Sequence, residues 1–120
     1  MPYPFDNQTA IYIQIMDAIK TEIISGKYAV GQKLPSVRDF ALQFDANPNT
    51  VQKALFELEN EGLIVTERTS GKFVTSDEKV ILSARLSKVD KIVEDYFSRM
   101  AKIGIDRCEA EKLLNKKESL

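Results

Sequence analysis

Histidine is absent from this 120-residue sequence, and cysteine occurs only once, at Cys108. These absences exclude metal sites built from histidine and cysteine, Ser–His triads, Cys–His nucleophile pairs and any disulfide within the chain. The formal net charge of −1 gives no support for nucleic-acid binding on composition alone. The length suits one domain of about 100–150 residues. We therefore expect neither an enzyme nor a metal or cofactor site.

Long apolar runs are also missing, since no stretch approaches the roughly 18 apolar residues that a membrane-spanning helix needs. The first ten residues, MPYPFDNQTA, lack the basic-then-apolar pattern of a secretory signal. The sequence therefore predicts a cytoplasmic protein without membrane contact.

Apolar residues return at intervals of three and four early in the chain, which predicts a helix over about residues 9–25. Its expected buried face consists of Tyr12, Ile15, Met16, Ile19 and Ile23. Gly26 suits the left-handed cap that ends such a helix. Residues 27–35 lack this periodicity, so we interpret them as a connecting loop.

Two further helices are indicated by their start signals. Ser36 with Asp39 three residues later is a variant of the capping box. Asn47 with Pro48 joins a preferred N-cap residue to the residue preferred at the first helical position. The expected buried residues are Val37, Phe40, Ala41 and Phe44 in the second helix, and Val51, Ala54, Leu55 and Leu58 in the third, which we expect to run to Glu61. The pair forms a helix-turn-helix signature, although an ordinary corner between two helices gives the same pattern.

A β-hairpin is predicted directly after these helices. Residues 63–67 and 72–75 are β-prone and flank a turn in which Gly71 supplies a positive φ. A helix-turn-helix followed at once by a hairpin is the order of a winged helix. The predicted fold is mainly α with a small β-hairpin: a winged helix-turn-helix domain over residues 1–76 and a two-helix tail over residues 77–120.

Three pieces of sequence, in this order and spacing, carry a family resemblance: ISGKYAVGQKLPSVRDFA, NTVQKALFELENEGLI and the hairpin end SGKFV. Residues 11–74 resemble the N-terminal domain of the GntR family of bacterial transcription regulators. The turn PNTVQ and the short C-terminal extension resemble the YtrA-like subfamily, in which two helices replace the large effector domain. The resemblance implies sequence-specific DNA binding and transcriptional repression.

The residue types at the start of the third helix suit DNA recognition. Asn49 and Gln52 can make bidentate contacts with adenine, whereas Lys53 is better suited to phosphate. Arg38 matches the arginine of the family's LPSxR motif, which implies a DNA contact near the start of the second helix. The complete set of expected DNA-binding residues is Ser36, Arg38, Asn47, Asn49, Thr50, Gln52, Lys53, Arg68, Ser70, Gly71 and Lys72.

Several of these residues have a purely structural alternative. Asn47 can serve only as a helix cap, and Lys53 can be an ordinary solvated lysine. Many family members also carry arginines where this chain has Pro48 and Gln52, so their target sequences cannot be transferred to it. A different class of function, a winged-helix adaptor that binds protein, would be favoured by exposed apolar residues on the third helix.

The tail carries apolar residues at alternating intervals of four and three, which is the pattern of a helical dimer seam. The expected dimerisation residues are Leu82, Leu86, Val89, Val93, Tyr96, Met100 and Ile103. The alternative is that this stripe packs back on the chain's own winged helix. A two-fold dimer implies double-stranded DNA with an inverted-repeat operator as its partner. Whether a small-molecule effector binds is unknown from sequence; the room left for one is between the tail helices or at the seam.

Overall fold

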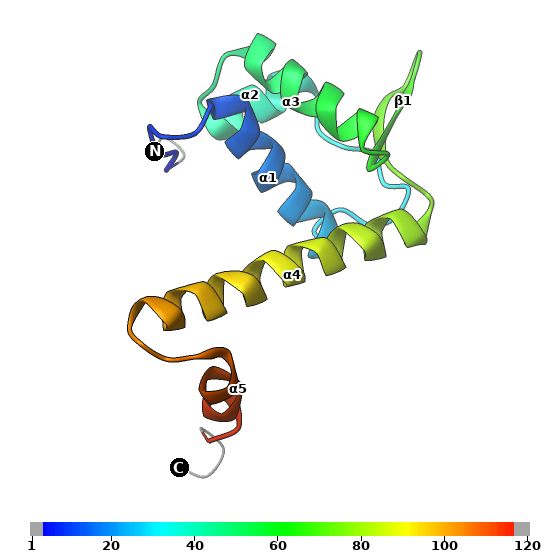
Figure 1. Cartoon of the computed structure of the whole chain (residues 1–120). Helices are drawn as coiled ribbons and strands as arrows, with labels where there is room; N and C mark the ends of the chain where they lie inside the picture. Colours follow the sequence, from blue (N-terminus) through cyan, green and yellow to red (C-terminus); the bar gives the residue numbers. More distant parts are fainter. Residues whose placement is uncertain (1–3, 117–120) are drawn as a thin grey trace. The chain divides into compact units, whose positions relative to one another are not determined.

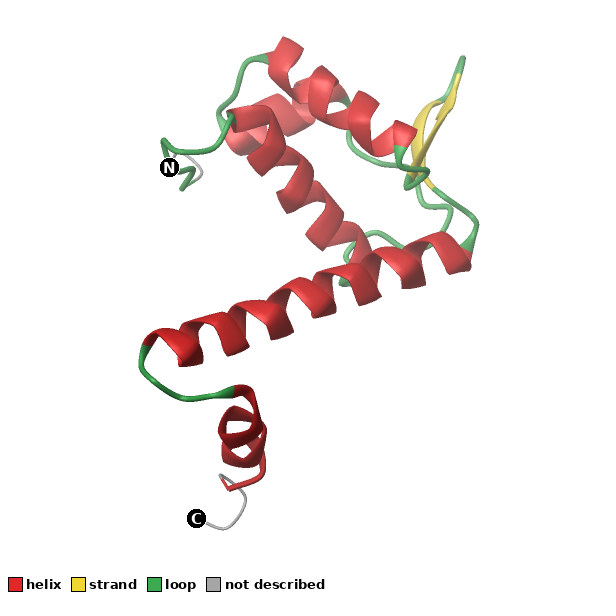
Figure 2. Cartoon of the chain, viewed as in Figure 1, coloured by secondary structure: helices red, strands yellow, loops and turns green. Residues whose placement is uncertain are grey.

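The computed structural model describes residues 4–116, which form five helices and a two-stranded antiparallel hairpin (Figures 1 and 2). In chain order these are α1 (Ile11–Ile24), α2 (Val37–Phe44), α3 (Pro48–Asn60), β1 (Ile64–Glu67), β2 (Gly71–Val74), α4 (Glu78–Lys102) and α5 (Arg107–Lys116). The mainly helical fold class predicted from sequence is confirmed. Among the helices of residues 4–116, none is both long enough and apolar enough to span a membrane.

The chain divides within α4 into two compact units, the first ending at Ser83 and the second starting at Ala84. The division predicted from sequence, 1–76 and 77–120, stays a prediction, and residues 1–3 and 117–120 of it lie outside the described residues. The first unit extends into α4 because Ile81 is buried there.

The core of the first unit lies where α1, α2 and α3 pack together. The fully buried side chains include Ile15, Ile19, Phe40, Phe44, Val51, Leu55 and Leu58. The apolar face predicted for each helix is thus the buried one, although Tyr12 and Met16 of α1 and Val37 of α2 are only half-buried. This packing fixes α3 on α1 and leaves the opposite side of α3 in solvent.

Local capping determines where α2 and α3 begin. The Ser36 side-chain oxygen accepts a hydrogen bond from the Asp39 backbone N–H at 3.1 Å, and Asn47 Oδ1 accepts one from the Asn49 N–H at 2.8 Å. Between the helices, Asp45 adopts a left-handed conformation with φ 50°. Both predicted caps are confirmed, so the turn between α2 and α3 is specified by adjacent residues.

The hairpin pairs Ile64 with Val74 at its base and Glu67 with Gly71 at its tip (Figure 2). Gly71 has φ 113°, a backbone conformation that residues with a side chain rarely adopt, as the sequence predicts. Residues 32–34, assigned to a plain loop from sequence, also pair with β2: Lys33 forms a bridge with Phe73, and the Leu34 N–H donates to the Lys72 carbonyl at 2.8 Å. The hairpin is therefore anchored to the segment that leads into α2.

In the second unit, α5 is fastened to the later part of α4. The Tyr96 hydroxyl donates to the Ala110 carbonyl at 2.7 Å, and Ala110 is fully buried. Arg107 lies over the Phe97 ring and donates to Glu94 Oε1 at 2.7 Å, a hydrogen bond that lowers the pKa of the Glu94 carboxyl. Just before α5, the Asp106 side chain accepts a hydrogen bond from the Glu109 backbone N–H at 2.8 Å, which caps the start of this helix.

Candidate nucleic-acid interface

The outward side of α3 carries the polar residues expected to read DNA. Because Val51, Ala54, Leu55 and Leu58 are buried, the helical spacing turns Asn49, Gln52 and Lys53 outward, and all three are exposed. Thr50, nearer the packed side, is half-buried. The start of α3 therefore presents amide and ammonium groups together with the N–H groups of its first turn, an arrangement suited to base edges and phosphate.

Lys53 has a partner that the sequence did not reveal. Its Nζ lies 4.0 Å from the centroid of the Tyr12 ring, which comes from the first turn of α1. Tyr12 was assigned from sequence to the buried face of that helix, and it is half-buried. Helical spacing alone gives the edge position of this ring but not its contact with a lysine 41 residues further along the chain.

Four of the expected DNA-binding residues line one hollow. A hollow of 270 Å³ lies between the turn of the hairpin and the start of α2, and the expected residues that line it are Ser36, Ser70, Gly71 and Lys72. Lys33 contributes to its wall, because its segment pairs with β2. The sequence could not show that Ser36 lies beside the other three, since more than 30 positions separate it from Ser70.

Lys72 also contacts residues of β1 and α3. Its Nζ donates to Thr66 Oγ1 at 2.9 Å and lies 3.7 Å from Glu59 Oε2, and the Thr66 hydroxyl donates to that same carboxylate oxygen at 2.9 Å. The ion pair joins the hairpin to α3. The lysine thus has a structural role in the chain without DNA, whereas Arg68 in the hairpin turn and Arg38 on α2 are exposed.

One apolar side chain also lies on the outward side of α3. Phe56 is 57% exposed and follows Gln52 and Lys53 by about one helical turn. The sequence signal for this exposure is that Phe56 falls outside the three-and-four spacing of the buried residues Val51, Ala54, Leu55 and Leu58.

Residues 11–74 match the family model described as "Bacterial regulatory proteins, gntR family". The chain belongs to the GntR family. The repressor YtrA of Bacillus subtilis (strain 168) is 45% identical over 76 residues, which cover 63% of this chain and 58% of YtrA. A GntR family transcriptional regulator from Listeria monocytogenes has a solved structure that is 37% identical, with a TM-score of 0.83 over 97% of this chain and 99% of that one. The structure of the AraR DNA-binding domain in complex with the operator ORR3 is 27% identical, with a TM-score of 0.53 over 62% of this chain and 93% of that one.

Membership of the GntR family makes this chain a DNA-binding transcription regulator rather than an enzyme. The winged-helix fold expected from the order of the elements is confirmed by the same similarity. The individual DNA-binding residues stay predictions.

The cap of α3 allows a structural role for Asn47 to be separated from a DNA contact. Asn47→Ala removes the acceptor for the Asn49 N–H and should lower the free energy of unfolding by about 1 kcal/mol. Asn47→Asp keeps a good cap but adds negative charge beside the expected DNA surface, so it should leave stability nearly unchanged and weaken DNA binding. Urea unfolding and fluorescence anisotropy on both variants measure the two effects. If the Asn47→Asp protein binds DNA as well as the wild type does, the role of Asn47 is helix capping alone.

Proposed function

We propose that this GntR-family regulator is a homodimeric repressor that binds an inverted-repeat operator through α3 and the hairpin, which serves as the wing. The observation that carries the proposal is an apolar stripe along α4 that its own chain leaves largely exposed. Its residues Leu82, Leu86, Val89, Val93 and Ile103 are between 41% and 70% exposed. The remaining two residues of the predicted seam, Tyr96 and Met100, are half-buried.

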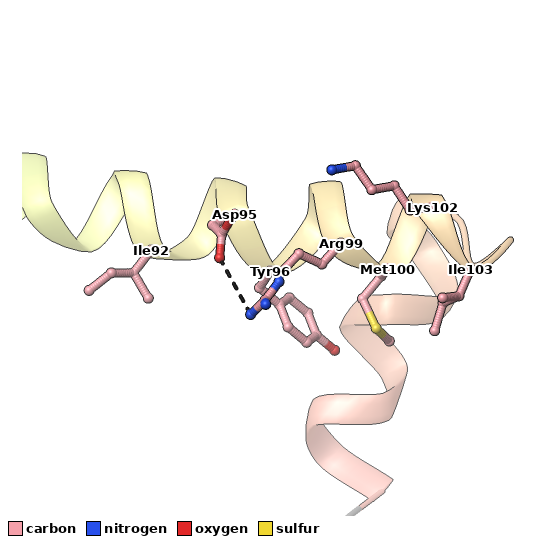
Figure 3. Close-up of a pocket in the computed structure, with 7 residues that line it drawn as sticks. All are labelled: Ile92, Asp95, Tyr96, Arg99, Met100, Lys102 and Ile103. Atoms are coloured by element: carbon pink, nitrogen blue, oxygen red, sulfur yellow. Dashed lines mark ion pairs between the residues drawn. The ribbon is translucent and has the colours of Figure 1, made fainter. Parts of the chain in front are cut away.

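Part of this stripe borders an open hollow of 740 Å³ on the later part of α4 (Figure 3). Its apolar lining consists of Ile92, Tyr96, Met100 and Ile103. Charged groups edge it, among them Asp95 and Arg99, which form an ion pair at 3.9 Å. An apolar floor with a charged rim is the anatomy of a protein interface, and a long exposed stripe is a liability for a chain that stays monomeric. A second copy of α4 supplies a matching apolar surface.

Two-fold symmetry follows from pairing identical stripes, because each copy then presents the same surface to the other. Two winged helices related in this way read two half-sites of opposite orientation, which is an inverted repeat. Within each half-site, we assign base contacts to Asn49 and Gln52. Phosphate contacts are assigned to Lys53, Arg38 and the wing.

Repression and the YtrA-like subfamily are proposed from similarity to the repressor YtrA, of which this chain covers 58%. A further structural relative, YtrA from Sulfolobus acidocaldarius, is described as a GntR-family transcription factor. A regulator of this kind works where it reaches its operator, so we propose a cytoplasmic location.

The DNA-reading face is tested by two neighbouring residues of α3. Gln52→Ala should weaken binding to the selected operator by about 1–3 kcal/mol and relax its base preference, because a base contact is lost. Lys53→Ala should weaken binding to every duplex and reduce the slope of log K against log salt by about 0.9, because one phosphate contact is lost. The measurement is fluorescence anisotropy over a series of salt concentrations, on an operator selected from random duplexes.

Asn60→Ala is the matched control, since Asn60 is exposed at the far end of the same helix. It should bind DNA as the wild type does. Unchanged affinity and salt slope in both Gln52→Ala and Lys53→Ala would refute the assignment of this face to DNA.

Exposure of Phe56 is the observation that favours the second candidate, a winged-helix adaptor that binds protein. The polar residues Asn49, Gln52 and Lys53 on the same side of α3, together with GntR membership, favour DNA. A purified wild-type protein that binds no duplex from the random pool would favour the adaptor.

A further inference from the structure

We infer that Tyr12 is a positioning residue, which holds the Lys53 ammonium at the start of α3 ready for a DNA phosphate. The inference rests on the proposed function, because Lys53 is a phosphate contact only if α3 reads DNA. The contact that carries it is the 4.0 Å separation between Lys53 Nζ and the centroid of the Tyr12 ring. A cation within about 6 Å of a ring centroid is attracted by the negative face of the ring.

The ring is a fixed platform because the core determines its place. Tyr12 belongs to the first turn of α1, whose next residues toward the core, Ile15 and Ile19, are completely buried. α1 packs directly on α3, where Val51 and Leu55 are also completely buried (Figure 1). The distance between the ring and the Lys53 backbone is therefore set by two packed helices.

The segment before α1 is fastened as well. Gln14 Nε2 donates to the Thr9 carbonyl at 2.7 Å, and Gln14 Oε1 accepts from the Asp6 N–H at 2.9 Å. These bonds tie the chain entering α1 to its first turn, where Tyr12 lies.

The physical benefit is preorganisation. A lysine on a flexible four-carbon stem loses much of its rotamer freedom when it grips a phosphate. Within residues 4–116, Lys53 has no carboxylate partner, so the ring is what restrains its ammonium. A phosphate attracts the ammonium more strongly than the ring does, so Lys53 can leave the ring and bind DNA. Part of the loss of rotamer freedom has then already occurred in the free protein.

The test is a double-mutant cycle with Tyr12→Leu, Lys53→Met and the two together, and Tyr12→Phe as the matched control. Tyr12→Leu removes the ring and should weaken operator binding two- to fivefold, without changing the salt slope, because the lysine is still present. Tyr12→Phe keeps the ring face and should bind like the wild type. Lys53→Met should reduce the salt slope by about 0.9, and adding Tyr12→Leu to it should cost nothing more.

A second readout needs no DNA. Proton NMR of the wild type should show the Lys53 methylene signals shifted upfield by the ring, and Tyr12→Leu should return them to ordinary positions. If Tyr12→Leu weakens DNA binding equally in the wild type and in the Lys53→Met variant, Tyr12 has a structural role only. A loss on Tyr12→Phe as large as that on Tyr12→Leu would mean that the hydroxyl itself contacts DNA. Either result overturns the inference but leaves the proposed function intact, whereas a wild type that binds no duplex overturns both even if the NMR shift is present.

Discussion

Val89→Asp should weaken binding to the full inverted repeat by about 10²–10⁴-fold while leaving binding to a single half-site unchanged. Val89 lies in the middle of the apolar stripe of α4 and is 45% exposed in the single chain. A carboxylate there stays hydrated in the monomer but must be buried when two stripes pair, which is costly for an unpaired charge. Without pairing, each winged helix binds its half-site alone and the gain from joint binding is lost. Sedimentation equilibrium and anisotropy on full and half operators measure the two parts of this effect.

Ser87→Asp is the control with the same new charge. Two residues along a helix correspond to about 200° of rotation, so Ser87 lies on the side of α4 opposite Val89, and it is exposed. This variant should sediment and bind like the wild type. A wild-type chain that is monomeric at micromolar concentration, or a Val89→Asp protein that binds the full operator normally, would contradict the dimer.

The helices could be predicted because their signals lie within a few residues of one another. Ser36 and Asn47 are capping residues placed just before apolar residues of helical period, and both make the expected bonds. Gly71 likewise marks the hairpin turn through its own backbone requirement. Such signals depend on local chemistry, and the sequence shows them directly.

Contacts between distant elements could not be predicted in the same way. The Lys53–Tyr12 contact, the Lys72–Glu59 ion pair and the pairing of Lys33 with Phe73 each join residues that no short motif relates. The sequence predicted that Lys53 and Lys72 are basic residues near DNA. It could not show that each already has a partner in the chain without DNA.

The limits of the first unit also depend on contacts between elements that lie apart in the sequence. The prediction placed the end of the winged helix at residue 76, where the β-prone segment ends. In the structure, the first turn of α4 continues the packing: Ile81 is buried, and Val80 Cγ1 lies 3.8 Å from where a Cβ on Gly62 would be. A truncation intended to isolate the DNA-binding unit should therefore end after Ser83.

Phe40→Ala should lower the free energy of unfolding by about 3–5 kcal/mol, because it deletes a large, completely buried ring. The ring packs edge-on against Tyr28, at 6.4 Å between centroids, and stacks on Phe44 at 6.1 Å. Small domains are stable by only about 5–15 kcal/mol, so the loss removes a large fraction of the total. Since α2 packs on α3, DNA binding should fail at a lower temperature than in the wild type.

Leu42→Ala, on the same helix, is the control that separates burial from helix propensity. Leu42 is 75% exposed, so its loss should change stability by no more than about 0.5 kcal/mol. Urea unfolding followed by circular dichroism measures both variants, and equal slopes against urea would show that the folded and unfolded states are comparable. Comparable losses from Phe40→Ala and Leu42→Ala would mean that Phe40 is not at the centre of the core. A large loss confined to Phe40→Ala would show that the stability of the first unit depends on the aromatic packing of Phe40 with Tyr28 and Phe44.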